Sequence, residues 1–261
     1  MGQLYSLLAL NRAVARRFEV VNSTADTGVE ATIYLYDMIV SNDWEAEWYG
    51  GVTPMMFITE LANITADTVH LRINSPGGDV FGARVIEQAI RESNKTIIAH
   101  IDGYCASAAT YIALACSKVI IASGGMFMIH NAWTMAWGDK TDLTKTATLL
   151  GKIDSTLAAT YAAKTGKTVE EIAAYMDAET WFTAQEAVDV GFVDEISAAQ
   201  NGQNGTQNAS AWNMSVYRNA PKPAKPAPKQ EQQPPEPKTP DPAPLNFDRE
   251  AAARRLAVAL I

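Results

Sequence analysis

The chain has 261 residues, of which 48% are hydrophobic and 19% charged, and its formal net charge is −8 at pH 7. This length and apolar content suffice for a sizeable buried core, while the acidic balance argues against nucleic acid as the main ligand. Two cysteines eleven positions apart, with no CxxC motif and no clustered histidines, indicate neither a disulfide framework nor a zinc site, and we expect no cofactor.

The N-terminal residues do not fit an export signal. They hold an apolar stretch of seven residues before Asn11, and the basic residues follow this stretch rather than precede it. A secretory signal has the opposite order, and no segment is long enough to span a membrane. MGQLYS matches the N-myristoylation pattern, but so short a pattern often occurs by chance. We therefore expect a reducing cytoplasm as the compartment.

Strands and helices alternate over the first half of the chain. Five short runs rich in Ile, Val and aromatic residues are typical of strands: 30–40, 67–75, 95–103, 118–123 and 125–133. Residues 80–94 place apolar side chains at helical spacing, and residues 106–116 are apolar nearly all round, as in a buried helix. The alternation predicts an α/β domain with a largely parallel sheet.

Beyond Trp133 the pattern becomes helical. Three helices are predicted: one from about Lys140 to Lys164, and two shorter ones over 168–176 and 183–191. Both TVEE (168–171) and TAQE (183–186) fit the capping box that starts a helix, and Gly166 and Gly191 suit helix ends.

The C-terminal residues differ in composition from the rest. Ten of the 12 prolines lie between Pro221 and Pro244, in a polar stretch that follows a Gln/Asn/Gly-rich one. We expect residues 199–246 to be a disordered linker. The last residues, FDREAAARRLAVALI (247–261), predict a short amphipathic helix, which needs a partner because isolated helices of this length are marginal in water.

The stretch DGYCASAAT (102–110) places two potential nucleophiles, Cys105 and Ser107, where a strand gives way to a helix. The amide groups of a helix's first turn have no partner inside the helix and favour a developing anion. Small residues at such a joint also serve close packing, so the chain must supply a base and an oxyanion hole as well.

Two further stretches offer these groups. His130 ends the run MFMIH, and the ends of neighbouring parallel strands lie at one edge of a sheet, where a base can meet the serine. His70 and His100 fall within strands and are interpreted as structural. INSPGGD (73–79) ends another strand in a Pro-Gly-Gly turn, whose glycines let backbone N–H groups approach a ligand.

Four stretches occur in sequence: INSPGGD (73–79), GYCASAA (103–109), MIHNAW (128–133) and a block from Thr165 to Ile196. In this order they resemble the proteolytic subunit of the Clp protease, over residues 30–198. More narrowly, the acidic ETWFT version of the last block, the N-terminal extension (1–29) and the proline-rich tail resemble the Clp-like head maturation proteases of tailed phages.

The resemblance implies the α/β fold shared by ClpP and the crotonases, with a largely parallel sheet. It also implies that the helix from about Lys140 protrudes as a handle, which in the family joins two rings face to face. The expected assembly is therefore a homo-oligomeric ring, or two stacked rings, without nucleic-acid or membrane partners.

Carried over position by position, the resemblance makes Ser107 the nucleophile and His130 the general base. The backbone N–H groups of Gly78 and Ala108 correspond to the family's oxyanion hole. Cys105 becomes a packing residue, because it lies before the helix start that would activate it.

The third member of the triad is the main departure from the family. Glu179 in ETWFT stands where the family usually has aspartate, and Asp177 is a competing orienter of the histidine. A glutamate reaches one methylene further and serves this role in other hydrolases. A second departure is NAWTMAWGDK (131–140), with two tryptophans where the family often has a glycine-rich turn, which implies a different pocket preference.

The leading hypothesis is a serine endopeptidase that acts on scaffold or capsid precursor segments during phage head maturation, in the host cytoplasm or within the prohead. The first alternative is a cellular Clp peptidase that works with an ATP-dependent unfoldase. A crotonase-type enzyme acting on acyl-CoA would need no Ser–His pair, and a catalytically silent assembly protein is the last alternative. The tail favours the first hypothesis, and we expect self-cleavage within residues 199–246.

Overall fold

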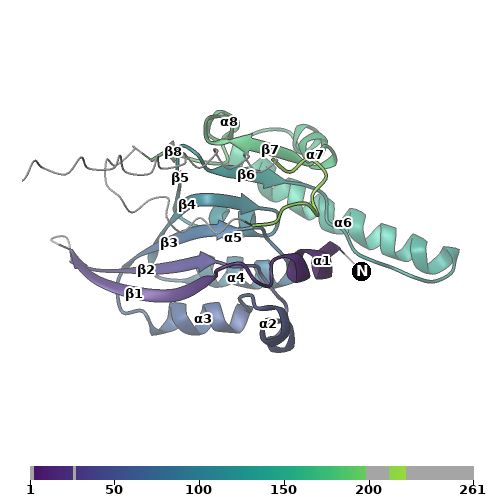
Figure 1. Ribbon diagram of the computed structural model, residues 1–261. Coiled ribbons are helices and arrows are strands. Elements are labelled where there is room, and N and C mark those ends of the chain that lie inside the picture. Colours follow the sequence, from purple (N-terminus) through teal and green to yellow (C-terminus); the bar gives the residue numbers. More distant parts are fainter. Residues whose placement is uncertain (1–2, 26–27, 198–211, 222–261) are drawn as a thin grey trace, which may run out of the picture. The chain divides into compact units, whose positions relative to one another are not determined.

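A single eight-stranded sheet forms the centre of the computed structural model, which describes residues 3–25, 28–197 and 212–221 (Figure 1). The strands are β1 (Arg17–Ala25), β2 (Gly28–Tyr36), β3 (Thr68–Ser75), β4 (Thr96–Ala106), β5 (Lys118–Ile121), β6 (Met126–Ile129), β7 (Thr180–Thr183) and β8 (Glu195–Ile196). All described residues belong to one compact unit, residues 1–221.

The sheet is mostly parallel. Its order is β1-β2-β3-β4-β5-β8, and only β1 with β2 and β6 with β7 pair antiparallel. The largely parallel α/β sheet expected from the sequence is therefore confirmed.

Strand β4 is longer than the sequence pattern predicted, and its two halves have different neighbours. Its first half, Ile98–Ile101, pairs with β5, whereas its last residues, Tyr104–Ala106, pair with β6. The helix expected over 106–116 is accordingly shorter. Because β4 runs on to Ala106, the residue after it lies beside the end of β6.

Eight helices surround the sheet within the described residues: α1 (Gln3–Leu10), α2 (Asp43–Tyr49), α3 (Pro54–Asn63), α4 (Val80–Glu92), α5 (Ala109–Leu114), α6 (Lys140–Thr165), α7 (Val169–Asp177) and α8 (Ala184–Val190). The predicted helices α4, α6, α7 and α8 are confirmed within a few residues. Both capping boxes form, and Gly166 and Gly191 end their helices with left-handed backbones. The sequence pattern missed β1, β7, β8, α1, α2 and α3.

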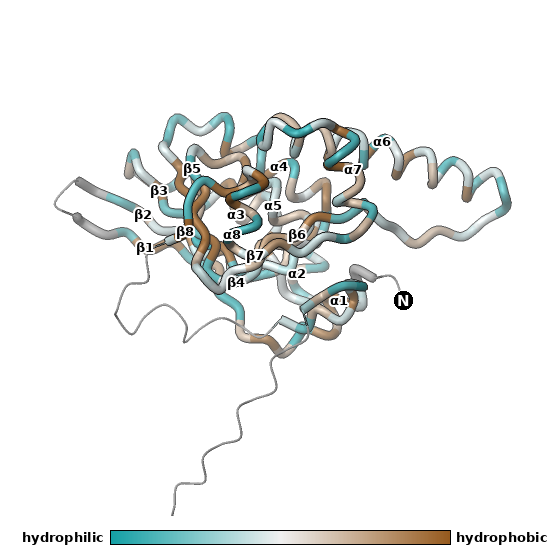
Figure 2. The backbone as a smooth tube through the Cα atoms, turned by 90° about the horizontal axis from the view of Figure 1, so that it is seen from above, coloured by the Kyte–Doolittle hydropathy of each residue, from teal (hydrophilic) through white to brown (hydrophobic). Residues whose placement is uncertain are grey.

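Helix α6 projects from the body of the fold, as expected for the handle (Figure 1). Only Leu157, Ala158 and Tyr161 in its second half are buried, and the first half is largely exposed. The hydropathy colouring shows the same division, with hydrophobic residues concentrated in the sheet and pale or hydrophilic ones along the projecting part of α6 (Figure 2). No helix among the described residues combines the length and apolar character needed to cross a bilayer.

Residues 212–221 correct the expectation that the whole of 199–246 is a disordered linker. Trp212, Met214 and Tyr217 are 4–6% exposed and form a second apolar core with residues of α1 and with the ends of β4 and β6. The average composition of the linker concealed these large apolar residues, because proline and glutamine dominate it. The other linker residues and the helix expected over 247–261 lie outside the described residues.

The N-terminal extension joins the same second core. Leu7 and Leu8 of α1 are buried in it. The side chain of Asn11 donates from Nδ2 to the carbonyl of Asn213 at 3.0 Å and accepts from the Asn213 backbone N–H at 2.6 Å. Segments from the two ends of unit 1–221 thus pack together at the edge of the sheet where β4 and β6 end.

Candidate active site

Ser107 occupies a strained turn between β4 and α5. Its φ is 53°, in the left-handed region that non-glycine residues seldom adopt. Its N–H donates to the Met128 carbonyl at 2.9 Å, and its own carbonyl accepts from the backbone N–H and the hydroxyl of Thr110, at 3.0 and 2.6 Å. The hydrogen bonds on both sides fix a sharp strand-to-helix turn, the conformation that exposes a nucleophilic serine in other hydrolases.

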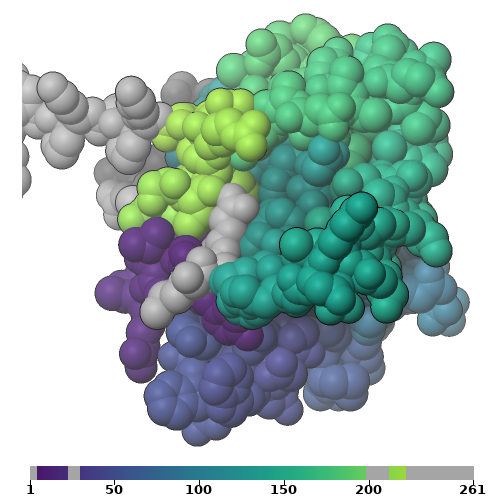
Figure 3. All heavy atoms as spheres, turned by 90° about the vertical axis from the view of Figure 1, so that its right-hand side faces the viewer, coloured from purple at the N-terminus to yellow at the C-terminus, as the bar shows by residue number. Residues whose placement is uncertain are grey.

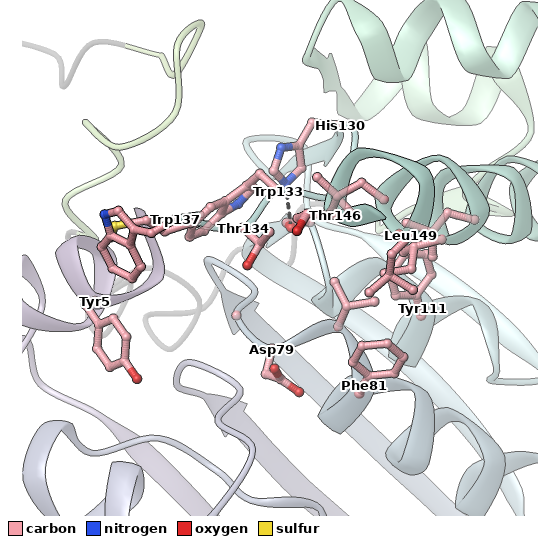
Figure 4. A pocket seen from close by; sticks show the side chains of 18 residues that line it. Tyr5, Asp79, Phe81, Tyr111, His130, Trp133, Thr134, Trp137, Thr146 and Leu149 are labelled. Carbon is pink, nitrogen blue, oxygen red and sulfur yellow. Dashed lines mark hydrogen bonds between the residues drawn. The ribbon is translucent and has the colours of Figure 1, made fainter. Parts of the chain in front are cut away.

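His130 meets Ser107 because of the β4–β6 register. Ala106 pairs with Met128, so the residues that follow these two strands lie side by side. The Nε2 atom of His130 is 2.7 Å from the Ser107 hydroxyl oxygen, the contact drawn as a dashed line in Figure 4. With Nε2 unprotonated, the hydroxyl donates and the imidazole is placed to take its proton.

Burial lowers the pKa of His130 to about 4, and the charge of Glu179 partly opposes this shift. The imidazole is therefore neutral at neutral pH, the form that a general base requires. The base and its hydroxyl partner meet the distance criterion for a Ser–His pair.

The Pro-Gly-Gly turn lies directly against Ser107. A Cβ on Gly77 would lie 2.5 Å from the Ala106 carbonyl oxygen and 2.9 Å from the Ser107 Cβ. A Cβ on Gly78 would lie 2.0 Å from the Ile39 carbonyl oxygen. Both glycines also have positive φ, 89° and 147°, so the turn can come this close only without side chains.

The two expected oxyanion donors lie close to Ser107, one in the chain and one in the same cavity. Ala108 is the first residue after Ser107, and Gly78 lines the same cavity as Ser107 and His130. Within the described part of the chain, neither the Gly78 nor the Ala108 N–H makes a hydrogen bond. Both donors therefore remain available to a bound ligand.

The two candidate orienting carboxylates have different surroundings. Glu179 has a φ of 48° and accepts from the backbone N–H of Asn219 at 2.6 Å and of Arg218 at 2.9 Å. Asp177 instead accepts from the side chain of Asn131 at 2.7 Å. Among the described residues no hydrogen bond joins either carboxylate to His130, but the charge of Glu179 raises the pKa of His130. The geometry thus brings Glu179 into electrostatic range of the base without a direct contact.

Cys105 lies in the main hydrophobic core. It is fully buried, and burial raises the pKa of its thiol well above the ordinary value. A thiol that stays protonated is a poor nucleophile, so the geometry favours Ser107 over Cys105. His70 and His100 lie on β3 and β4 and contact one another at 2.9 Å, away from Ser107.

A cavity of about 340 Å³ opens beside the Ser107 hydroxyl (Figure 4). Its walls come from the residues after His130, from the start of α4, from α5 and from one face of α6. They are mainly apolar: Phe81, Tyr111, Trp133, Trp137, Leu149 and Ile153. Both tryptophans singled out in the sequence therefore line this cavity. A second, more polar hollow lies on the other side of His130, lined by residues that include Asp177, Glu179, Ser215 and Arg218.

Tyr217 was not among the site residues that the sequence patterns indicated. Its ring lies 5.4 Å from the His130 ring at an interplanar angle of 89°, and its hydroxyl donates to the Pro76 carbonyl at 2.5 Å. The only available signal was the group of large apolar residues in WNMSVY (212–217), within an otherwise polar stretch.

A partly buried Ser–His pair beside a glycine turn, on a mostly parallel α/β sheet, is typical of the class of serine hydrolases. A family model for the Clp protease matches residues 27–200. The chain is 32% identical over 130 residues to ATP-dependent Clp protease proteolytic subunit 1 of Leifsonia xyli, covering 49% of this chain and 66% of that protein. It is 32% identical over 137 residues to the ATP-dependent Clp protease proteolytic subunit of Streptococcus gordonii, covering 51% and 70%.

The fold agrees with these similarities. A point mutant of ClpP1 from Listeria monocytogenes superposes with a TM-score of 0.55 and 23% identity, covering 65% of this chain and 92% of that one. The chain belongs to the Clp protease family, and the expectation of a Clp-type serine peptidase is confirmed at the level of the family.

Proposed function

We propose that the protein hydrolyses peptide bonds with Ser107 as the nucleophile and His130 as the general base. The 2.7 Å contact between the Ser107 hydroxyl and His130 Nε2 carries this proposal. As the hydroxyl oxygen attacks the carbonyl carbon, its proton passes to Nε2. The imidazolium then gives this proton to the leaving amine, the C–N bond breaks, and an acyl-enzyme remains. Water, deprotonated by the same histidine, releases the acid and restores Ser107.

The N–H groups of Gly78 and Ala108 stabilise the oxyanion in this mechanism. Donors already oriented toward the developing charge cost no reorganisation when the reaction occurs. Glu179 acts through charge, because it stabilises the imidazolium that forms on His130. Asp177, hydrogen-bonded to Asn131, is the less favoured orienter.

The cavity beside Ser107 accepts the substrate side chain next to the scissile bond. Its aromatic and aliphatic walls favour a large apolar side chain, since burial of such a group stabilises the complex by roughly 1.5–3 kcal/mol. Figure 4 shows that Trp133 and Trp137 lie at one end of this cavity and Tyr111 and Leu149 at the other.

At a finer level, we propose that the enzyme matures phage heads by cutting scaffold or capsid precursor proteins. The N-terminal extension and residues 212–221, most of which lie outside the family match, support a role beyond that of a standard Clp subunit. The alternative is a cellular peptidase subunit coupled to an unfoldase, and the names of the relatives, ATP-dependent Clp protease proteolytic subunits, favour it. A ring of identical subunits is part of both versions, with the exposed half of α6 available for contact between rings.

Peptide hydrolysis by the purified chain tests the proposal. We expect cleavage of a fluorogenic peptide with Leu or Phe before the scissile bond, and none by Ser107→Ala. An unfolded capsid precursor should be cut without ATP if the maturation role is correct. Cleavage that needs an added ATP-dependent unfoldase would favour the cellular role, and equal cleavage by Ser107→Ala would refute the peptidase assignment.

A further inference from the structure

Residues 212–221 cover the side of His130 that faces away from the substrate cavity. In Figure 3 this yellow-green segment forms a surface strip between the purple N-terminal part and the green part that follows α6. It is anchored outside the site: the Trp212 indole N–H donates to the Asn74 carbonyl at 3.0 Å, and Asn213 pairs with Asn11. The segment therefore has its own attachments, independent of Ser107 and His130.

Tyr217 contacts three parts of the proposed machinery from this side. The edge-to-face packing holds it against the His130 ring, and its hydroxyl donates to Pro76, directly before the two glycines of the oxyanion turn. Burial raises the pKa of Tyr217 well above its ordinary value, while a hydrogen bond with Ser107 lowers it. One tyrosine thus links the loops that carry the nucleophile, the base and the oxyanion donor.

The same segment also fixes Glu179. Both carboxylate oxygens accept from consecutive backbone amides, Arg218 and Asn219, and the Asn219 side chain donates to the Ala178 carbonyl at 2.7 Å. Trp181 packs on the Tyr217 ring with centroids 5.8 Å apart. Because Glu179 makes no hydrogen bond to His130 within the described residues, packing must limit the rotation of the imidazole.

We infer that Tyr217 is a positioning residue, which holds the His130 ring toward Ser107 and shields it from water while residues 218–219 hold Glu179. The inference rests on the proposed function and extends it to a segment beyond the matched family region. Inhibition by occupation of the substrate site is less favoured, because Tyr217 lines the polar hollow behind His130 and is not part of the apolar cavity wall.

The pH dependence of Ser107 reactivity separates this role from a purely structural one. The groups that face His130 are Ser107, Glu179 and Tyr217, and Asp177 and Arg218 line the hollow on the same side. Removal of the Tyr217 ring exposes the imidazole to water, and its pKa then rises from about 4 toward 6.5. A general base must be unprotonated to act, so the rate of Ser107 labelling falls at pH values below the pKa of His130. This fall on the acidic side, the acid limb of the pH profile, should move to higher pH as the pKa of His130 rises.

The experiment measures the rate of Ser107 labelling by a fluorophosphonate from pH 4 to 9, with full-length chains. For Tyr217→Ala we expect a rate about 10²-fold lower at pH 7.5, because small displacements of a base are costly, and an acid limb nearer pH 6.5. Tyr217→Phe keeps the ring against His130 and should lose less than about tenfold with an unchanged limb, since only the hydrogen bonds of the hydroxyl, to Pro76 and Ser107, are removed. The control is Tyr34→Ala, which also removes a tyrosine ring, but from β2, where Tyr34 packs on Arg17 and Tyr36. Its labelling rate and acid limb should match those of the wild type.

If the wild-type chain is labelled and Tyr217→Ala has the same rate and the same acid limb, this inference is overturned and the proposed function stands. Faster labelling would overturn it too, because the segment would then be inhibitory. No labelling of the wild-type chain would overturn the proposed function and the inference together. If circular dichroism shows that Tyr217→Ala is unfolded, Tyr217→Leu replaces it. Its apolar side chain still shields His130 from water but lacks the flat ring, so the labelling rate should fall while the acid limb stays at low pH. A wild-type rate in Tyr217→Leu would refute the positioning role.

Discussion

The two sides of His130 have different origins in the chain. The side that faces Ser107 is built from motifs close in sequence to strand ends, all inside the region that matches the Clp protease family. The side that faces away is covered by Tyr217 and its neighbours in residues 212–221, beyond that region, and α1 packs against the same segment. A serine hydrolase site can therefore combine a reactive face inside the region that matches the family with a supporting face outside it.

Removal of either member of the Ser–His pair should have the largest effect. We expect Ser107→Ala and His130→Ala each to lower kcat/KM for a peptide by at least about 10³-fold, with no further loss in the double variant, because the two groups act as a unit. Steady-state kinetics of the three variants test this. Additive losses would mean that the two residues act independently.

The carboxylate substitutions test which acid serves the base. Glu179→Gln should lower turnover by about 10³-fold, since an amide cannot stabilise the imidazolium and presents a donor to the backbone N–H groups of residues 218 and 219. Asp177→Asn should cost less than tenfold, because its partner Asn131 can hydrogen-bond to an amide as well. The reverse ranking of the two variants would assign the role to Asp177.

Activity should persist to lower pH than an ordinary histidine allows. The pKa of His130 is lowered from 6.5 to about 4, so the acid limb of kcat/KM should lie well below pH 6.5. The unfolded chain takes up a proton near pH 6.5 and the folded one only near pH 4, so stability is full above pH 6.5 and falls as the pH drops through this window. If kcat/KM of the wild-type chain already falls near pH 6.5, the imidazole is exposed to water and the account of its burial is wrong.

Two glycine-to-alanine substitutions should change the stability of the fold in opposite directions, and these are the smallest effects we predict. Gly78→Ala should destabilise the fold by roughly 1–3 kcal/mol, because a Cβ would strike the Ile39 carbonyl and φ is positive. Gly151→Ala is the matched control: nothing lies within 4 Å of its Cβ position in α6, and alanine should stabilise the helix by about 0.5–1 kcal/mol. Thermal unfolding of both variants measures the difference, and equal shifts would contradict the tight turn.

Sequence patterns captured the reactive face well because local chemistry dictates it. A glycine turn, a small-residue joint and a histidine at a strand end each follow from backbone geometry, and the capping boxes of α7 and α8 formed at the expected residues. The register that brings Ser107 to His130 could not be read from the sequence, since it depends on β4 pairing with both β5 and β6.

The supporting face was missed for a physical reason. Trp212 and Tyr217 are stabilised by contacts with residues more than 130 positions away, such as Asn74 and Pro76, and such contacts leave no local periodicity. The composition of the surrounding linker indicated disorder, and it concealed a short apolar segment that the core can bury. Its position refines the self-cleavage expected within 199–246: a cut that leaves residues 212–221 intact and attached to the fold must fall after residue 221.

Site mapping of a fluorophosphonate adduct tests the central claim most directly. After reaction of the full chain at pH 7.5, digestion and mass spectrometry should place one adduct on Ser107, absent in both Ser107→Ala and His130→Ala. An adduct on Cys105 or on another serine, or an unmodified Ser107 in a folded and fully reacted sample, would contradict the assignment of Ser107 and His130 as the reactive pair.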